Sequence, residues 1–176
     1  MISEETKQIL IKQLSDHEGF KKTPYLDSVG IWTVGIGRNL KRLLTPDEEF
    51  KIFGKVCKYN YEKLVATLKT KVLTTDQVEY LFVNDLDDHI SRLYSDLPWV
   101  SELDEPRQAV LINMAFNLGN NGLLAFKNTL NLIKDGKYDA AGAAMLNSKW
   151  AEQVKRRAVE LSAQMTSGKF AVKYVK

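Results

Sequence analysis

The sequence predicts an α+β fold with a small N-terminal β-sheet lobe that a long helix joins to a helical C-terminal lobe. Three observations predict it. Strand-forming and turn-forming residues occur together between residues 23 and 37, and the chain has helical composition after residue 45. The segment from about residue 74 to 95 has the apolar periodicity of one long amphipathic helix. With 176 residues, 44% of them hydrophobic, the chain can bury a core.

A first helix is expected over residues 3–16. Ser3 suits the N-cap position, and two glutamates follow in the first turn, where acidic side chains favour the helix dipole. Glu18 therefore falls at the end of this helix, directly before Gly19. The apolar side of the helix is made of four residues: Ile9, Leu10, Ile11 and Leu14.

The segment 23–37 predicts a hairpin or a three-stranded sheet, because β-branched and aromatic residues flank a turn. The turn is Asp27-Ser28-Val29-Gly30, which is rich in turn-forming residues. Asp27 should therefore lie in a polar turn, where a carboxylate is readily ionised.

The rest of the chain predicts helices. Thr74 and Gln77 have the spacing of a capping box, which would begin the helix 74–95. A buried helix is expected from Asp104 to Leu118-Gly119, followed by helices at 123–135, 138–147 and 149–164. We expect one domain, residues 1–176, with an N-terminal lobe at 15–73, the connecting helix at 74–95, and a C-terminal lobe at 96–176 on which helix 3–16 packs.

The composition argues against several kinds of site. Cys57 is the only cysteine, so an intrachain disulfide or a cysteine-based zinc site is excluded. The acidic segment Asp85–His89 lacks the glycine and the terminal glutamate of a calcium loop, so we expect a face of a helix there and no metal. We therefore expect neither a metal nor a cofactor.

The formal charge of +3 is unevenly distributed. Residues 127–176 carry ten Lys/Arg against four Asp/Glu, whereas residues 1–126 carry fifteen against eighteen. The basic C-terminal part is either a solvated surface or a surface for electrostatic contact with an anionic envelope. The sequence has no long apolar run and no basic, apolar start, so we expect synthesis in the cytoplasm and no stable membrane insertion.

Two carboxylates have different settings that suit glycoside hydrolysis, which commonly uses one protonated and one ionised carboxyl group. Glu18 lies at a helix end beside Gly19-Phe20, where apolar surroundings favour the protonated form. Asp27 lies in a polar turn, which favours the ionised form. These residues are the candidate acid and its ionised partner.

The residues around this pair resemble the active-site signature of phage lysozymes of the T-even type, glycoside hydrolase family 24. The matching runs are His17-Glu18-Gly19, Tyr25-Leu26-Asp27 and Gly30-Ile-Trp-Thr33-Val-Gly35-Ile-Gly37. A second block, from Ala109 through Gly119 to Asn128-Thr129-Leu130 and Trp150, is similar to the buried helix and groove wall of that family. Residues 17–38 and 74–170 match well, while 41–73 match only in helical character.

The resemblance implies a lysozyme-like fold and a set of catalytic roles. Glu18 would be the general acid, Asp27 would orient or activate the attacking water, and the Thr33 hydroxyl would help to hold that water. Arg157 would reach the catalytic glutamate and orient it, although the neighbouring Arg156 competes for this assignment. The stereochemical outcome is open: a carboxyl separation of ~6.5–9.5 Å would fit inversion and ~5–5.5 Å retention.

The resemblance also implies a saccharide groove, with Phe116 and Thr129 among its lining residues. Asn39 falls where the family usually has an apolar groove residue, and Ala144 replaces a common substrate-binding asparagine. Gly30 would serve the turn.

Arg38 stands where the family typically has a histidine, facing an aspartate that is retained here as Asp85. An Arg–Asp ion pair would lack the titration of histidine near neutral pH.

The function implied is hydrolysis of the β-1,4 bond between N-acetylmuramic acid and N-acetylglucosamine, for lysis of the host cell. We expect a monomer that binds peptidoglycan glycan strands and no nucleic acid. It would reach the periplasm from the host cytoplasm through a pore made by another protein. The alternatives are a non-catalytic protein of this fold that binds glycan or nucleic acid, and a chitinase or transglycosylase that uses the same acid.

Overall fold

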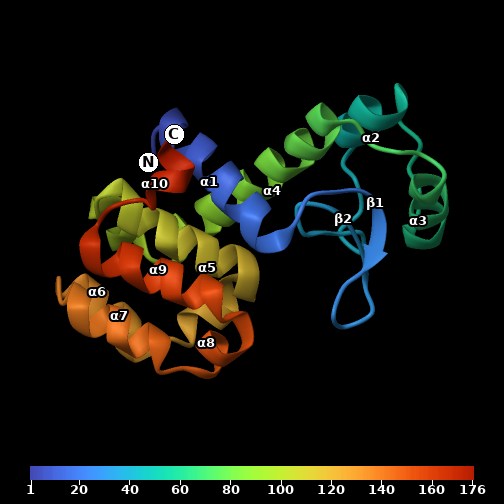
Figure 1. Ribbon diagram of the computed structural model, residues 1–176. Helices are drawn as coiled ribbons and strands as arrows, with labels where there is room; N and C mark the ends of the chain where they lie inside the picture. Colours follow the sequence, from blue (N-terminus) through green and yellow to red (C-terminus); the bar gives the residue numbers. More distant parts are fainter. The chain divides into compact units, whose positions relative to one another are not determined.

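The computed structural model describes residues 1–176, whose internal contacts divide the chain into two compact units. The unit Leu14–Asp87 is called the sheet unit below. The helical unit combines Met1–Gln13 with Asp88–Lys176. The chain passes between the units within helix α1 (Glu4–Glu18) and again within helix α4 (Thr75–Asp96) (Figure 1). The predicted α+β class is confirmed, since one small sheet in the N-terminal half accompanies helices elsewhere.

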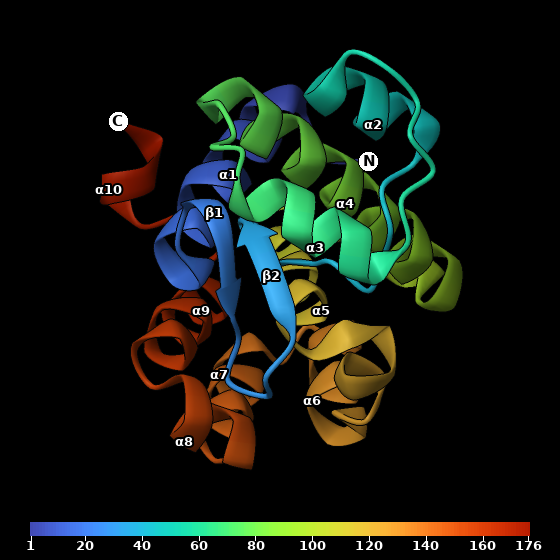
Figure 2. The ribbon, with the colours of Figure 1, turned by 90° about the vertical axis from the view of Figure 1, so that its right-hand side faces the viewer.

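The sheet unit contains a three-stranded antiparallel sheet in the order β1-β2-β3, as the sequence predicts. Its strands are β1 (Lys21–Leu26), β2 (Trp32–Gly35) and β3 (Arg38–Asn39). Figure 2 shows β1 and β2 side by side, joined by the predicted turn. Strand β2 is central, so its residues have neighbours on both sides.

Helices α2 (Pro46–Phe53) and α3 (Tyr61–Lys69) complete the sheet unit together with its part of α4. Helix α3 packs on β1, and the backbone amide of Leu73 donates to the Lys22 carbonyl at 2.9 Å. These contacts return the chain to the sheet before α4 begins. Buried apolar residues of the unit include Val34, Ile36, Leu64, Leu68, Val78 and Phe82.

The helical unit is built around α5 (Glu105–Leu124), in which every residue from Ala109 to Ala115 is buried. Helix α9 (Arg156–Ser167) packs on α5, and α7 (Tyr138–Leu146) packs on α9 (Figure 1). Helix α6 (Lys127–Lys134) packs on α7. The remaining elements are the 3₁₀ helix η1 (Pro98–Glu102) and helices α8 (Lys149–Val154) and α10 (Val172–Val175).

Several predicted helix boundaries need correction. The chain does bend at Gly119, which has φ 74° and ψ 160°, but helical structure resumes beyond it and continues to Leu124. The helix expected from residue 123 begins only at Lys127. The helix expected over 149–164 is interrupted at Lys155, whose φ is 48°. Helix propensity alone therefore did not place these boundaries, because it is only a weak guide to where a helix begins and ends.

The capping box predicted for α4 is confirmed. The amide of Gln77 donates to Thr74 Oγ1 at 3.1 Å, and the amide of Thr74 donates to Gln77 Oε1 at 3.0 Å.

No single helix of the chain is long and apolar enough to cross a membrane. Helices α5 and α6 reach the required length and hydropathy only when taken together, as a pair bent by 104°.

Candidate active site

Glu18 is the last residue of α1, as the sequence predicts. The helix ends there because Gly19 adopts a φ of 84°, a conformation that favours glycine. The Gly19 amide still donates to the Ser15 carbonyl at 2.9 Å, which fixes the final turn. Glu18 is half-buried, so its carboxyl group is held on an ordered helix end beside the sheet.

Asp27 is held by the backbone of its own turn. Its Oδ1 accepts from the amides of Val29 at 2.9 Å and Ile31 at 2.8 Å. Gly30, with a φ of 77°, lets the chain reverse and donates its amide to the Asp27 carbonyl at 3.1 Å. Asp27 Oδ2 makes no hydrogen bond to the protein, so one carboxylate oxygen is anchored and the other is available to a water molecule.

Thr33 lies on β2 and is buried, with 4% of its surface exposed. Its hydroxyl donates to the Ile31 carbonyl at 3.1 Å and is not hydrogen-bonded to Asp27. Because the hydroxyl proton is used in this way, Thr33 Oγ1 can act only as an acceptor towards a water. A water that donates one hydrogen bond to Thr33 Oγ1 and another to Asp27 Oδ2 would be held in one orientation.

Tyr25 belongs to the same group of residues, although the sequence reasoning assigned it no role. It is directly opposite Thr33 in the pairing of β1 with β2, and Thr33 is opposite Asn39 in the pairing of β2 with β3. Directly opposed residues of antiparallel strands lie on one face of a sheet. Burial raises the pKa of the Tyr25 phenol, and the charges of Glu18 and Asp27 raise it further. The charges of both carboxylates are therefore close enough to Tyr25 to affect the pKa of its phenol.

Arg157, in the helical unit, is buried with 6% exposure. Its Nε donates to Asn113 Oδ1 at 2.9 Å and its Nη2 donates to the Asn113 carbonyl at 3.3 Å. Arg156, in contrast, is 61% exposed at its side chain and lies 3.9 Å from Glu160 one turn later. The structure thus distinguishes the two arginines: Arg157 is fixed in the interior, and Arg156 belongs to the surface.

A chain of buried amides holds the partner of Arg157. Asn113 Nδ2 donates to Gln13 Oε1 at 3.1 Å, and Gln13 Nε2 donates to Gln164 Oε1 at 2.9 Å. Gln164 Nε2 donates in turn to the Pro106 carbonyl at 2.7 Å. These contacts orient Asn113 so that its oxygen faces the guanidinium. The sequence reasoning missed this network, although a lone asparagine in an otherwise apolar run was a usable signal.

The predicted groove residues have different settings. Thr129 is 5% exposed, and its hydroxyl makes no hydrogen bond to the protein; it lines a pocket of about 280 Å³ together with Ala144. Phe116 is half-buried, with its ring centre 5.1 Å from that of His89. In the sheet unit, Asn39 Oδ1 accepts from the Lys41 amide at 2.8 Å. Thr129 is therefore the residue of this set with an unused polar atom at a pocket wall.

Arg38 and Asp85 form a buried ion pair in the sheet unit, with Arg38 Nη1 2.8 Å from Asp85 Oδ1. The same guanidinium also contacts Glu48, with Nη2 2.7 Å from Oε2 and Nη1 3.1 Å from Oε1. Glu48 has no exposed surface and accepts further from Asn84 at 3.0 Å. The partly exposed Arg42 contacts Asp85 at 2.8 Å. Two cations thus face two carboxylates.

The role of Glu48 was not predicted from the sequence, although the run Thr45-Pro-Asp-Glu48 has the form of a capping box. The structure contains that capping box: the Glu48 amide donates to Thr45 Oγ1 at 3.3 Å, and the Thr45 amide donates to Glu48 Oε2 at 2.9 Å. Glu48 therefore caps α2 and binds Arg38 with the same carboxylate.

The electrostatics of this cluster follow from its burial. Burial raises the pKa of Asp85 to about 6 against the opposing effect of Arg38 and Arg42. The pKa of Glu48 is lowered, because hydrogen bonds and charge from Arg38 outweigh its burial. The pKa of Arg38 is raised above its ordinary value by the two carboxylates, although burial opposes this. Above pH 6 all three groups are therefore mostly charged.

Replacing Arg38 with histidine should make the stability of the protein fall as pH rises. An imidazole that faces Asp85 and Glu48 has a folded-state pKa above its unfolded value of ~6.5, so its stabilising contribution is present below that value and lost as pH rises through the folded pKa. We expect the melting temperature of Arg38→His, relative to wild type, to drop by about 4 °C between pH 6 and pH 8. Parallel melting curves across this range would contradict the account.

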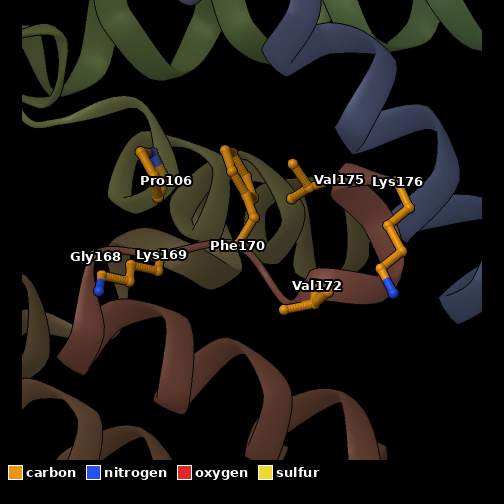
Figure 3. Close-up of a pocket in the computed structure, with 7 residues that line it drawn as sticks. All are labelled: Pro106, Gly168, Lys169, Phe170, Val172, Val175 and Lys176. Carbon is orange, nitrogen blue, oxygen red and sulfur yellow. The ribbon is translucent and has the colours of Figure 1, made fainter.

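A separate pocket of about 500 Å³ lies at the end of the helical unit and is shown in Figure 3. Its walls are mainly apolar and include Pro106, Phe170, Val172 and Val175, together with two lysines. No aspartate, glutamate or histidine lines it, and none of the predicted site residues does.

Similarity to known proteins extends across both units. A family model described as phage lysozyme matches residues 15–163. Two Dictyostelium discoideum proteins, described as probable T4-type lysozymes 1 and 2, are 30% identical over 155 residues and 28% identical over 158 residues. Each alignment covers 86% of this chain and 89% of the relative. The pre-baseplate central spike protein Gp5 of Enterobacteria phage T4 is 26% identical over 162 residues, which are 90% of this chain and 28% of that protein.

Proposed function

The chain belongs to the phage lysozyme family, and from this premise we propose that it is a muramidase and endolysin, which hydrolyses peptidoglycan to lyse the host cell. The family supports a lysozyme-type glycosidase activity. The bond cut would be the β-1,4 bond between N-acetylmuramic acid and N-acetylglucosamine. The observation that carries the proposal is the setting of Asp27, whose Oδ1 is anchored by two backbone amides while Oδ2 makes no hydrogen bond to the protein.

In the proposed reaction, Glu18 donates a proton to the glycosidic oxygen while the bond from that oxygen to the anomeric carbon breaks. A water attacks the anomeric carbon, with one of its protons passing to Asp27 Oδ2 and the other accepted as a hydrogen bond by Thr33. The leaving sugar departs with a free hydroxyl. Glu18 ends ionised and Asp27 protonated, and proton exchange with solvent restores both groups.

The surroundings give each carboxylate a distinct task. The two amides at Oδ1 fix the orientation of the Asp27 side chain, which leaves Oδ2 to accept a proton from water. Arg157, fixed by Asn113, would orient the general acid as the family resemblance implies. We further propose that the enzyme acts as a monomer on glycan strands and reaches the periplasm from the host cytoplasm through a pore made by another protein.

Clearing of permeabilised Gram-negative cells tests this function against the non-catalytic alternative. Wild type should clear the suspension, and Glu18→Gln should not, because glutamine cannot donate the proton. Circular dichroism of both proteins should match, since Glu18 lies at a half-buried helix end.

Equal clearing by the two proteins would contradict the enzymatic proposal and would indicate lysis by the cationic part of the chain alone. Failure of both proteins to clear, combined with retention on insoluble cell wall, would favour a binding protein of the same fold.

A further inference from the structure

A groove of about 310 Å³ in the helical unit lies outside the proposed catalytic residues. We propose that it is a second glycan-binding site, which holds an anionic muramyl-peptide part of the wall strand. The inference rests on the proposed function, since it assigns a further contact to the same polymer. Seven residues of η1, α5, α6 and their connections line the groove: Leu97, Trp99, Leu124, Lys127, Leu130, Asn131 and Lys134.

Helix α6, labelled in Figure 2, contributes four of the seven residues that line this groove. Lys127, Leu130, Asn131 and Lys134 have the spacing i, i+3, i+4 and i+7, which places them on one side of a helix. Leu130 is buried, whereas the two lysines and Asn131 are exposed. The face therefore combines an apolar floor with a cation at each end and an amide between them.

Trp99 forms the aromatic wall and differs from the other two tryptophans of the chain. The Trp32 ring is covered by the Lys69 amine at 3.7 Å from its centre. The Trp150 indole is buried and donates to Asn117 Oδ1 at 2.8 Å. Trp99 is half-buried, and it has neither a hydrogen-bond partner nor a ring contact in the protein. Its ring face and its N–H are thus both available to a sugar, which has apolar and polar faces.

The charge of the groove selects an anionic ligand. Neither Lys127 nor Lys134 forms an ion pair, and no acidic residue lines the groove. Four of the seven lining residues also belong to the basic segment 127–176, where ten Lys/Arg stand against four Asp/Glu. A muramyl peptide matches these features, because its sugar ring can lie on the indole while its peptide carboxylates face the two ammonium groups.

The position of Lys127 favours a ligand on the same strand as the substrate. Lys127 also lines the pocket that contains Thr129 and Ala144. The pocket and the groove therefore share one lysine on α6. In our proposal, a glycan strand held at Thr129 continues over Lys127 towards Trp99. Contacts in this groove would increase the affinity for long wall polymers without taking part in catalysis.

Binding to insoluble peptidoglycan sacculi tests the site, with Glu18→Gln as the background so that the polymer stays intact. Trp99→Ala, and the pair Lys127→Ala with Lys134→Ala, should each weaken co-sedimentation about tenfold, as expected for the loss of one ring contact or of two charge contacts. The matched control is Lys137→Ala with Lys149→Ala, which removes two exposed, unpaired lysines from the same basic region. This control should change binding less than twofold.

Tryptophan fluorescence identifies the ligand class. Addition of N-acetylmuramyl dipeptide should change the emission of the background protein, and Trp99→Phe should remove that change. A neutral chitooligosaccharide should have a weaker effect, because it lacks the carboxylate. Vesicles of phosphatidylglycerol should not compete with the dipeptide.

Equal loss of sacculus binding in the groove pair and the control pair would overturn the proposal and leave only general charge attraction. Competition by anionic vesicles would also overturn it, in favour of a lipid. Hydrolysis by the wild type is measured separately on sacculi. If the wild type does not hydrolyse but the groove variants alone lose binding, the proposed activity fails while the glycan site stands.

Discussion

Replacing Asp27 with asparagine should reduce hydrolysis of peptidoglycan about 10²–10⁴-fold while leaving the fold intact. The reason lies in the two oxygens of the side chain. The amide oxygen of asparagine can still accept from the amides of Val29 and Ile31, so the turn keeps its anchor. The position of Oδ2 becomes an NH₂ group, which cannot accept a proton from water. The substitution thus removes the proton acceptor and preserves the conformation of the turn.

Initial rates of fragment release from purified sacculi measure this loss, and thermal melting measures the fold. The matched control is Asp47→Asn, which removes the same charge at an exposed position of α2 and should leave the rate unchanged. If Asp27→Asn retained more than a tenth of the wild-type rate, Asp27 would not be the group that activates the water.

Replacing Arg38 with alanine should destabilise the protein by about 3–5 kcal/mol, because it leaves the buried Glu48 without a cation and Asp85 with only the partly exposed Arg42. Arg38 and Glu48 are 2% and 0% exposed at their side chains, so water cannot take the place of the guanidinium without opening the cluster. For a chain of this length the loss corresponds to roughly 10 °C in melting temperature.

The control for this prediction is Arg42→Ala. Arg42 contacts the same Asp85, yet its side chain is 40% exposed, so its removal should cost at most about 1 kcal/mol. The cost of Arg38→Ala should also shrink as pH falls, because Asp85 and Glu48 then take up protons and lose the charge that needs compensation. A loss that is small, or that grows towards acidic pH, would contradict the ion-pair account.

Local signals explain why much of the fold and part of the candidate site could be predicted from the sequence. The turn at Asp27 follows from its Asp-Ser-Val-Gly composition, and the end of α1 at Glu18 follows from Gly19. The ion pair of Arg38 with Asp85 depended on the family resemblance, since the two residues are far apart in the sequence.

The remaining features depend on contacts that no local pattern encodes. The network that fixes Arg157 joins residues from α1, α5 and α9, and each member is an ordinary polar residue in its own segment. Tyr25 acquires its relation to Thr33 only through strand register. The break at Lys155 occurs within a segment of helical composition, with no glycine or proline to mark it. Distant contacts of these kinds need the structure.

The mass of the reducing end released from peptidoglycan by the wild type tests the central claim most directly. The proposed reaction places a water between Asp27 and Thr33 and adds its oxygen to the anomeric carbon, so each cut should release a free, reducible N-acetylmuramic acid end. In H₂¹⁸O that end should carry the heavy oxygen. A 1,6-anhydro end, lighter by one water and without the label, would show that the sugar's own hydroxyl is the attacking group and would contradict the role proposed for Asp27 and Thr33.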